Sequence, residues 1–115
     1  MSSNLENTQA QMRKGVLEFC ILSILSHTEV YPSDIIARLK EAKLIVVEGT
    51  LYPLLSRLKN AGLLTYQWKE SNAGPPRKYY SLTPLGEKFL EELRQTWNEL
   101  VEAVHQTTKK PQTHE

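Results

Sequence analysis

Residues 48–58, EGTLYPLLSRL, combine a leucine repeat with an unusual set of polar side chains. The leucines recur at i, i+3, i+4 and i+7, the apolar face of an α-helix, at Leu51, Leu54, Leu55 and Leu58. An ordinary solvent-facing side would carry Glu, Lys and Ala, which have high helix propensity. Here it carries hydroxyl groups, a phenol, a proline ring and a guanidinium, from Thr50, Tyr52, Pro53, Ser56 and Arg57.

These groups suit the phosphates and base edges of DNA. The start of a helix has partial positive charge and free N–H groups, which attract phosphate. Thr50 and Ser56 can hydrogen-bond to either, while Tyr52 offers a ring to a thymine methyl group and a hydroxyl to phosphate. Arg57 can bind guanine or the backbone, and we favour phosphate because most protein–DNA contacts are to the backbone. The alternative is a solvated face on which Thr50 only caps the helix.

Charge is distributed unevenly along the chain. The whole chain has a net charge of only +1, which is weak support for nucleic-acid binding. Residues 84–104 contain five acidic residues against two basic ones, so this segment is not suited to face an anion. Chance scatter in a short chain is the alternative explanation. Residues 50–80, by contrast, contain one acidic residue against five basic ones: Arg57, Lys59, Lys69, Arg77 and Lys78.

Two helices are expected before this segment. Residues 1–10 are expected to be flexible. A first helix at residues 11–26 is apolar nearly all round, so we expect it to be buried on most of its circumference, with Cys20 in the core. A second helix follows at residues 34–42, with Ser33 as its N-cap.

The third helix has two alternative starts. With Thr50 as N-cap, Pro53 takes the third helical position, where its missing N–H costs nothing. A start near Val47 or Glu48 instead places Pro53 further inside, where it bends the helix slightly. Gly62 ends the helix, since a left-handed position after a helix prefers glycine.

A β-hairpin is predicted next, from LLTYQW and RKYYSL. Leu64, Tyr66 and Trp68 share one face of the first strand, and Tyr80 and Leu82 share one face of the second. The intervening KESNAGPP has turn chemistry throughout. The tip of this hairpin is expected to place its basic residues along the minor groove or the flanking phosphates of DNA. The alternative is a solvated loop without a binding role. The tip comprises Gly74, Pro75, Pro76, Arg77 and Lys78.

A long helix is predicted at residues 83–108, with Thr83 as N-cap and Pro84 as its first residue. Its apolar residues follow a heptad seam, which is typical of two helices packed along their length. Residues 109–115 are polar and are expected to form a disordered tail. The seam consists of Leu90, Leu93, Trp97, Leu100 and Val104.

The resulting fold class is mainly α with a small β-hairpin: a winged helix-turn-helix at residues 11–82 plus a C-terminal dimerisation helix. The segments GTLYPLLSRLKNAGLL and GPPRKYYSLTPLGEKFL resemble the PadR family of bacterial transcriptional regulators. The resemblance extends from about Lys14 to Val104. One departure is Val47–Glu48 before Gly49, where many members carry Ser or Asn and Pro.

The resemblance implies a dimeric winged-helix repressor whose C-terminal helix forms the dimer. Short members include regulators that bind flat hydrophobic drugs at the dimer centre, beside a tryptophan at the place of Trp97. Trp97, Leu93 and Leu100 are therefore candidate ligand-binding residues. From the residues alone, Trp97 is either an interface anchor or a ligand-stacking ring.

Together these features predict a homodimeric repressor that binds a palindrome-like operator in double-stranded DNA. Two third helices would enter successive major grooves about 34–36 Å apart, and a planar hydrophobic molecule between the last helices would change that spacing. The alternative is a winged helix used as a protein–protein interaction module. The candidate DNA contacts are Thr50, Tyr52, Pro53, Ser56, Arg57, Lys59, Arg77 and Lys78.

Other functional classes find little support in the sequence. His27, His105 and His114 have no paired carboxylate or nucleophile at catalytic spacing, so no enzyme is expected. No cofactor and no metal are expected, since there is no glycine-rich phosphate loop and no ligand cluster, and the chain has one cysteine. The polar N-terminus lacks a signal peptide and no apolar run is long enough to cross a membrane, so we expect a cytoplasmic protein.

Overall fold

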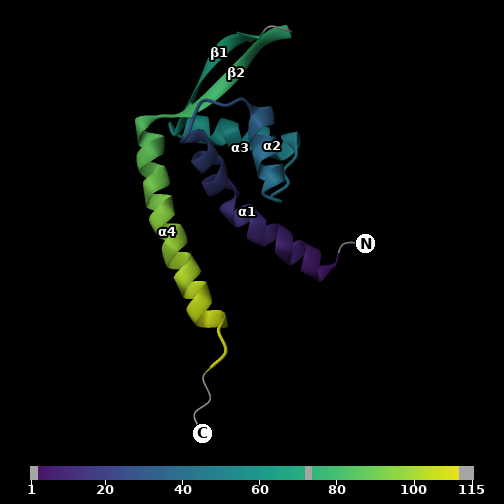
Figure 1. The fold of residues 1–115 in the computed structure, drawn as a ribbon, viewed down its shortest axis with the longest axis vertical. Coiled ribbons are helices and arrows are strands. Elements are labelled where there is room, and N and C mark those ends of the chain that lie inside the picture. The colour runs from purple at the N-terminus through teal and green to yellow at the C-terminus, as the bar shows by residue number, and fades with distance from the viewer. Residues whose placement is uncertain (1–2, 72–73, 112–115) are drawn as a thin grey trace.

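The computed structural model describes residues 3–71 and 74–111. Four helices and one hairpin follow in the predicted order (Figure 1). This confirms the predicted fold class, mainly α with a small β-hairpin. The elements are α1 (Asn4–Leu25), α2 (Pro32–Glu41), α3 (Glu48–Asn60), β1 (Leu64–Ser71), β2 (Gly74–Leu82) and α4 (Pro84–Thr108).

The core lies where α1, α2 and α3 meet beneath the hairpin. The leucine face of α3 is buried there, with Leu51 and Leu55 0% exposed and Leu58 1%. Full burial of one such side chain contributes about 1.5–3 kcal/mol, so this face anchors α3 firmly. The partners on the other two helices are Ile21, Leu22, Leu25, Ile35 and Leu39.

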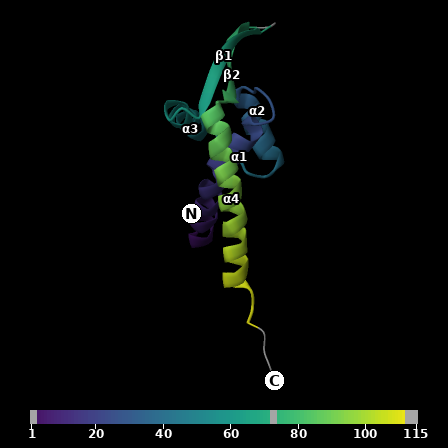
Figure 2. The same ribbon diagram turned by 90° about the vertical axis from the view of Figure 1, so that its left-hand side faces the viewer.

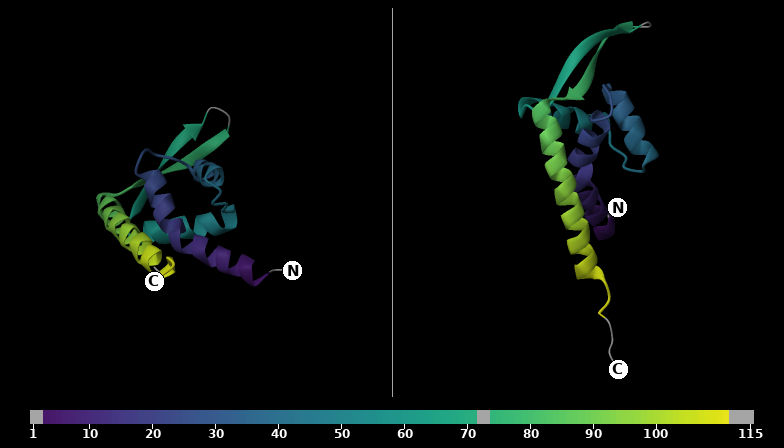
Figure 3. Two further views of the ribbon diagram at one scale, coloured as in Figure 1. Left: turned by 60° about the horizontal axis from the view of Figure 1, so that its bottom comes forward. Right: turned by 60° about the vertical axis from the view of Figure 1, so that its left-hand side comes forward.

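The molecule is elongated, because two elements extend beyond this core (Figure 2). The hairpin projects from one end, and α4 runs away from it in the opposite direction. The C-terminal half of α4 and the N-terminal half of α1 diverge from each other (Figures 1 and 3). Both halves are exposed in the single chain.

Helix α1 begins at Asn4, so the predicted start at residue 11 was wrong by seven residues. Ser3 caps the helix: its Oγ accepts a hydrogen bond from the Glu6 N–H at 3.0 Å. Ser-x-x-Glu is the sequence pattern of a capping box, which the polar composition of the first ten residues obscured. Residues 16–25 of α1 are buried or partly buried, with Cys20 partly buried beside the core, but residues 11–15 are exposed, so the predicted burial on most of the circumference holds only for the C-terminal part.

Helix α2 begins at Pro32, which makes Tyr31 the N-cap and not Ser33. Proline is favoured at the first helical position because its fixed φ already suits a helix and its N–H would have no partner. The Asp34 carboxylate accepts the backbone N–H of Tyr31 at 3.2 Å, which secures this earlier start. The preceding connection is tied to the hairpin, because Val30 and Tyr80 exchange backbone hydrogen bonds of 3.1 and 2.7 Å.

Helix α3 adopts the earlier of its two predicted starts. The Val47 carbonyl accepts the N–H groups of Thr50 and Leu51, each at 3.0 Å, so Thr50 lies in the first turn and is not the N-cap. Pro53 lies inside the helix. Gly62 ends it, as predicted, with φ +82°.

The hairpin confirms the predicted faces but is longer than expected. Tyr66 pairs with Tyr80 and Trp68 pairs with Lys78 in an antiparallel ladder. The strands include most of KESNAGPP, so Arg77 and Lys78 lie within β2 and not at the tip. Prolines are tolerated in β2 because an edge strand leaves one side without ladder hydrogen bonds. Part of the expected turn, residues 72 and 73, lies outside the described residues.

Helix α4 starts at the predicted cap. Thr83 Oγ1 accepts the Gly86 N–H at 3.0 Å and donates to the Gly62 carbonyl at 2.6 Å. A Cβ on Gly86 would lie 2.1 Å from the Leu63 carbonyl oxygen, so only glycine allows this close approach. The expected tail is only partly described, up to Pro111. None of the described helices is long and apolar enough to cross a membrane.

Candidate nucleic-acid interface

The predicted DNA contacts on α3 fall into two stripes along the helix. Tyr52, Ser56 and Lys59 are spaced i, i+4 and i+7 and form one stripe. Thr50, Pro53 and Arg57 are spaced i, i+3 and i+7 and form the other. All six are exposed, but the two stripes face different neighbours.

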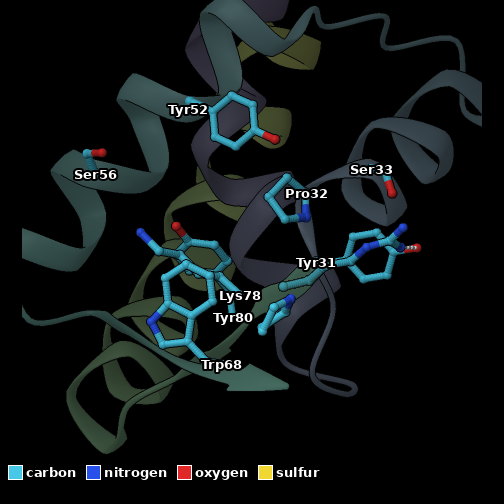
Figure 4. A pocket seen from close by; sticks show the side chains of 10 residues that line it. Tyr31, Pro32, Ser33, Tyr52, Ser56, Trp68, Lys78 and Tyr80 are labelled. Carbon is cyan, nitrogen blue, oxygen red and sulfur yellow. Dashed lines mark hydrogen bonds between the residues drawn. The ribbon is translucent and has the colours of Figure 1, made fainter. Parts of the chain in front are cut away.

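The first stripe faces the hairpin across an open hollow of about 680 Å³, here called the wing-side hollow (Figure 4). Tyr52 and Ser56 line it from α3, and Arg77 and Lys78 line it from β2. The structure thus brings four of the predicted site residues together from two separate elements. The remaining lining residues are Tyr31, Pro32, Ser33, Trp68, Pro76 and Tyr80.

The basic side chains beside this hollow lie over aromatic rings. Lys78 Nζ is 4.4 Å from the Tyr66 ring centroid and 5.3 Å from that of Trp68. Lys59 Nζ approaches the Tyr66 ring to 5.3 Å from α3. Such cation–π contacts contribute about 0.5–1 kcal/mol at exposed sites. These lysines are therefore oriented by their aromatic neighbours while their ammonium groups remain available to an anion.

Arg77 is held by Tyr31, from the connection before α2. Its Nη1 donates a 2.6 Å hydrogen bond to the Tyr31 hydroxyl, and its Cζ lies 4.8 Å from the ring centroid. Tyr31 in turn packs edge-on against Tyr79, with centroids 5.1 Å apart. The position of Arg77 thus depends on a tyrosine 46 residues earlier in the chain.

The second stripe of α3 faces α1 across a smaller hollow of about 360 Å³, here called the α1-side hollow. In it, Arg57 Nη2 lies 2.8 Å from Glu18 Oε2. The predicted DNA contacts of α3 are therefore divided between two sides of the helix and do not form one surface. The hollow is lined by Lys14, Leu17, Glu18, Thr50, Pro53, Leu54 and Arg57.

The predicted contacts missed six residues that line the wing-side hollow: Tyr31, Pro32, Ser33, Trp68, Pro76 and Tyr80. Trp68 is 61% exposed, unusual for so large an apolar side chain, and its ring packs edge-on against Tyr66 at 6.2 Å between centroids. The sequence feature that could have identified Trp68 is its position as an aromatic residue among the basic residues of the hairpin. Tyr31 and Ser33 had no such signal, because only tertiary packing brings the start of α2 to the hairpin.

The buried tyrosine at the base of the wing-side hollow, Tyr80, has a raised pKa. Burial raises the pKa of Tyr80, at the base of the hollow, and its neighbours Tyr66 and Tyr52 raise that pKa further. Elsewhere, burial also raises the pKa of the Cys20 thiol, which suits a packing residue better than a nucleophile.

The family of this chain follows from a comparison with known protein families. The model of the transcriptional regulator PadR-like family matches residues 21–92, which include α2, α3, the hairpin and the start of α4. The chain belongs to the PadR-like family. It is accordingly a DNA-binding transcription regulator with a winged-helix fold.

Solved structures of PadR-like proteins agree with this assignment. A PadR-like transcription factor from Bacteroides fragilis is 61% identical, with a TM-score of 0.74 over 89% of this chain and 99% of that chain. A PadR family regulator from Eggerthella lenta is 29% identical, with a TM-score of 0.85 over 93% and 94% of the two chains. A PadR-like regulator from Bacillus cereus is 40% identical, with a TM-score of 0.78 over 88% and 99%.

The PadR-like chain also carries an exposed apolar stripe on α4, beyond the part that the family model matches. Leu93 is partly buried, but Trp97, Leu100 and Val104 are 40%, 49% and 50% exposed. The Trp97 ring lies 6.2 Å from that of Phe19 on α1, measured between centroids. Trp97 thus already has an aromatic neighbour within its own chain.

Proposed function

We propose that this PadR-like regulator is a homodimeric repressor that binds a palindrome-like operator through α3 and the hairpin. The observation that carries the proposal is the wing-side hollow, where Tyr52 and Ser56 of α3 face Arg77 and Lys78 of β2. A recognition helix inserted in the major groove would place the hairpin beside the flanking phosphates.

The two classes of residue would have different tasks. Tyr52 and Ser56 contact base edges, because they lie on an exposed side of α3, the helix that enters the groove. Lys59, Arg77 and Lys78 bind phosphates, which fixes the position of the protein on the duplex without reading its sequence. Thr50, Pro53 and Arg57 lie on the flank of α3 that faces α1 and would meet the backbone on that side.

The exposed stripe on α4 supports dimerisation. Contiguous exposed apolar side chains are typical of protein interfaces, and the heptad spacing of this stripe suits a second helix. Helix α1 is exposed over its first half and carries Leu5 and Met12, 66% and 71% exposed, which a second copy could cover as well. A two-fold dimer would present two α3 helices to successive major grooves.

The same stripe is the candidate site for a planar hydrophobic ligand. Trp97, Leu93 and Leu100 would contact it at the dimer centre, and a ligand bound there would release the operator by changing the spacing of the two α3 helices. Titration of a Trp68→Phe variant with planar dyes tests this role, since Trp97 is then the remaining tryptophan. We expect quenching of Trp97 fluorescence and loss of DNA binding at the same dye concentrations.

Selection of duplexes from a random pool, followed by gel shift, tests DNA recognition directly. We expect a sequence with two-fold symmetry, bound with an affinity that falls steeply as salt increases. A winged helix that served only to bind another protein would enrich no sequence. It would also have no need for Lys59, Arg77 and Lys78 beside one hollow.

A further inference from the structure

Arg57 is a predicted DNA contact, yet its guanidinium is bound to a carboxylate within the chain. Nη2 lies 2.8 Å from Glu18 Oε2, so the contact joins α3 to α1. The side chain of Arg57 is 61% exposed and that of Glu18 is 29% exposed. An approaching anion can therefore reach the guanidinium without any rearrangement of the core.

The α1-side hollow around this pair resembles a phosphate site that already contains a carboxylate. Lys14 and Arg57 supply two cations, and Thr50 supplies a hydroxyl from the first turn of α3. Glu18 is the one acidic residue among those that line this hollow. Carboxylate and phosphate oxygens bind a guanidinium in the same way, through charge-assisted hydrogen bonds.

We propose that Glu18 is an intramolecular substitute for a DNA phosphate. In the free protein it holds Arg57; when α3 enters the groove, Arg57 exchanges Glu18 for a backbone phosphate, and Lys14 and Thr50 complete the phosphate site. The inference rests on the proposed function, because it requires α3 to enter DNA. It adds two residues of α1 to the interface and makes Glu18 a positioning residue that limits affinity.

Two effects give Glu18 this influence. The ion pair must be broken before Arg57 binds phosphate, which reduces the free energy that the phosphate contact contributes to DNA binding. Exposed ion pairs are nevertheless weak enough to exchange readily. After the exchange, an unpaired carboxylate remains beside the phosphate and repels it. Removal of the carboxylate charge eliminates both penalties while the neighbouring cations stay in place.

A Glu18→Gln variant tests the proposal on a duplex selected by the wild-type protein. At about 0.1 M salt we expect its affinity to rise about two- to fivefold, the range that an exposed ion pair supplies. Glu41→Gln is the matched control: it removes the same charge at the exposed C-terminal end of α2 and is expected to leave affinity unchanged. Glu18→Ala should show the same rise if the glutamine variant folds poorly.

A double-mutant cycle with Arg57→Gln shows whether the effect passes through Arg57. The single Arg57→Gln change should weaken binding and reduce the slope of log affinity against log salt by about one. In the Arg57→Gln background, Glu18→Gln should give a clearly smaller gain, because there is no ion pair to break and only the repulsion of the phosphate is relieved. A gain as large as in the wild type would mean that Glu18 acts only through its charge and not through Arg57, and the inference would fail.

The inference also fails if folded Glu18→Gln and Glu18→Ala proteins bind no more tightly than the wild type. In that case the ion pair would serve only to join α3 to α1. Thermal unfolding of each variant confirms that it is folded. Failure of the wild-type protein to bind any duplex would instead overturn the proposed function itself, so the two failures are distinguishable in one assay.

Discussion

Tyr52 lies across the wing-side hollow from Lys78 and Trp68 (Figure 4), which places a ring and a hydroxyl at the centre of the proposed interface. It is 46% exposed, so its truncation removes little packing. Arg57 lies on the other flank of α3 and is bound to Glu18. The two residues should therefore affect DNA binding in different ways, through base contacts for Tyr52 and through the phosphate backbone for Arg57.

Replacement of Tyr52 by alanine should weaken binding to the selected operator by about 1–3 kcal/mol, the usual worth of a base contact. Tyr52→Phe separates the two parts of the side chain: it retains the ring and loses the hydroxyl. Gel shift or fluorescence anisotropy measures both variants. Unchanged binding by Tyr52→Ala would remove Tyr52 from the interface.

The tyrosine at the base of the hollow gives a prediction about pH. Burial raises the folded-state pKa of Tyr80 above its value in the unfolded chain, so the folded protein retains this proton more strongly. The associated stability is present below pH about 10, the unfolded value, and is lost as pH rises through the folded pKa.

Thermal unfolding between pH 8 and 11 measures this loss. Tyr80→Phe, which keeps the ring and removes the titrating group, should lose less stability than the wild type over that range. Equal losses in the two proteins would show that other groups account for the alkaline transition.

At the scale of elements, α1 is the helix that joins α3, the proposed DNA-binding helix, to the apolar stripe of α4. Glu18 contacts Arg57 on α3, while the next residue, Phe19, contacts Trp97 on α4. Displacement of α4 relative to α1 would therefore act on the turn of α1 that also holds α3. This placement gives a short physical connection between the candidate ligand site and the recognition helix.

Two helical glycines have opposite roles, which predicts opposite effects of alanine. A Cβ on Gly86 would lie 2.1 Å from the Leu63 carbonyl oxygen, so Gly86→Ala must shift the start of α4 and should cost about 1–3 kcal/mol of stability. Gly15 lies within α1 and has no such neighbour within 4 Å of an added Cβ. Gly15→Ala should therefore stabilise the protein by about 0.5–1 kcal/mol.

Chemical denaturation measures the free energy of unfolding of both glycine variants. The Gly15→Ala protein serves as the control for the general effect of alanine in a helix. A stabilising effect of Gly86→Ala would contradict the close contact between Gly86 of α4 and the backbone of Leu63.

At the scale of the whole molecule, we propose that a second copy of the chain covers the exposed apolar side chains of α1 and α4. A lysine at Leu100 would place a charge in the centre of the proposed dimer interface, where burial of an unpaired charge is costly. We expect Leu100→Lys to be monomeric, with a mass near 13 kDa by light scattering, and to bind the two-fold operator weakly.

Gln95→Lys provides the matched control, because residue 95 lies on the opposite side of α4 from the apolar stripe, given 100° per residue. It adds the same charge and should leave both mass and DNA binding unchanged. A dimeric Leu100→Lys protein would show that α4 does not form the interface, and a monomeric wild type would refute the dimer itself.

Local features of the sequence predicted most of the elements. The 3.6-residue leucine repeat indicated the buried face of α3, the alternation at Leu64, Tyr66 and Trp68 indicated a strand, and Thr83–Pro84 indicated the start of α4. These predictions succeeded because each depends on periodicity or capping chemistry within a few residues. The errors at α1, α2 and the hairpin all concerned ends, where competing caps and turn residues decide the boundary.

The sequence showed which residue types make up the proposed interface. It did not show that the contacts of α3 are divided between the side facing the hairpin and the side facing α1. The sequence by itself determined that α3 has an apolar face and an unusually polar one, and that basic residues accompany the hairpin. Only the tertiary structure decided that Tyr52 faces the hairpin while Arg57 faces Glu18, and that Tyr31 holds Arg77. The physical reason is that the 3.6-residue period orients side chains around one helix, whereas their partners come from helices and strands that are distant in the chain.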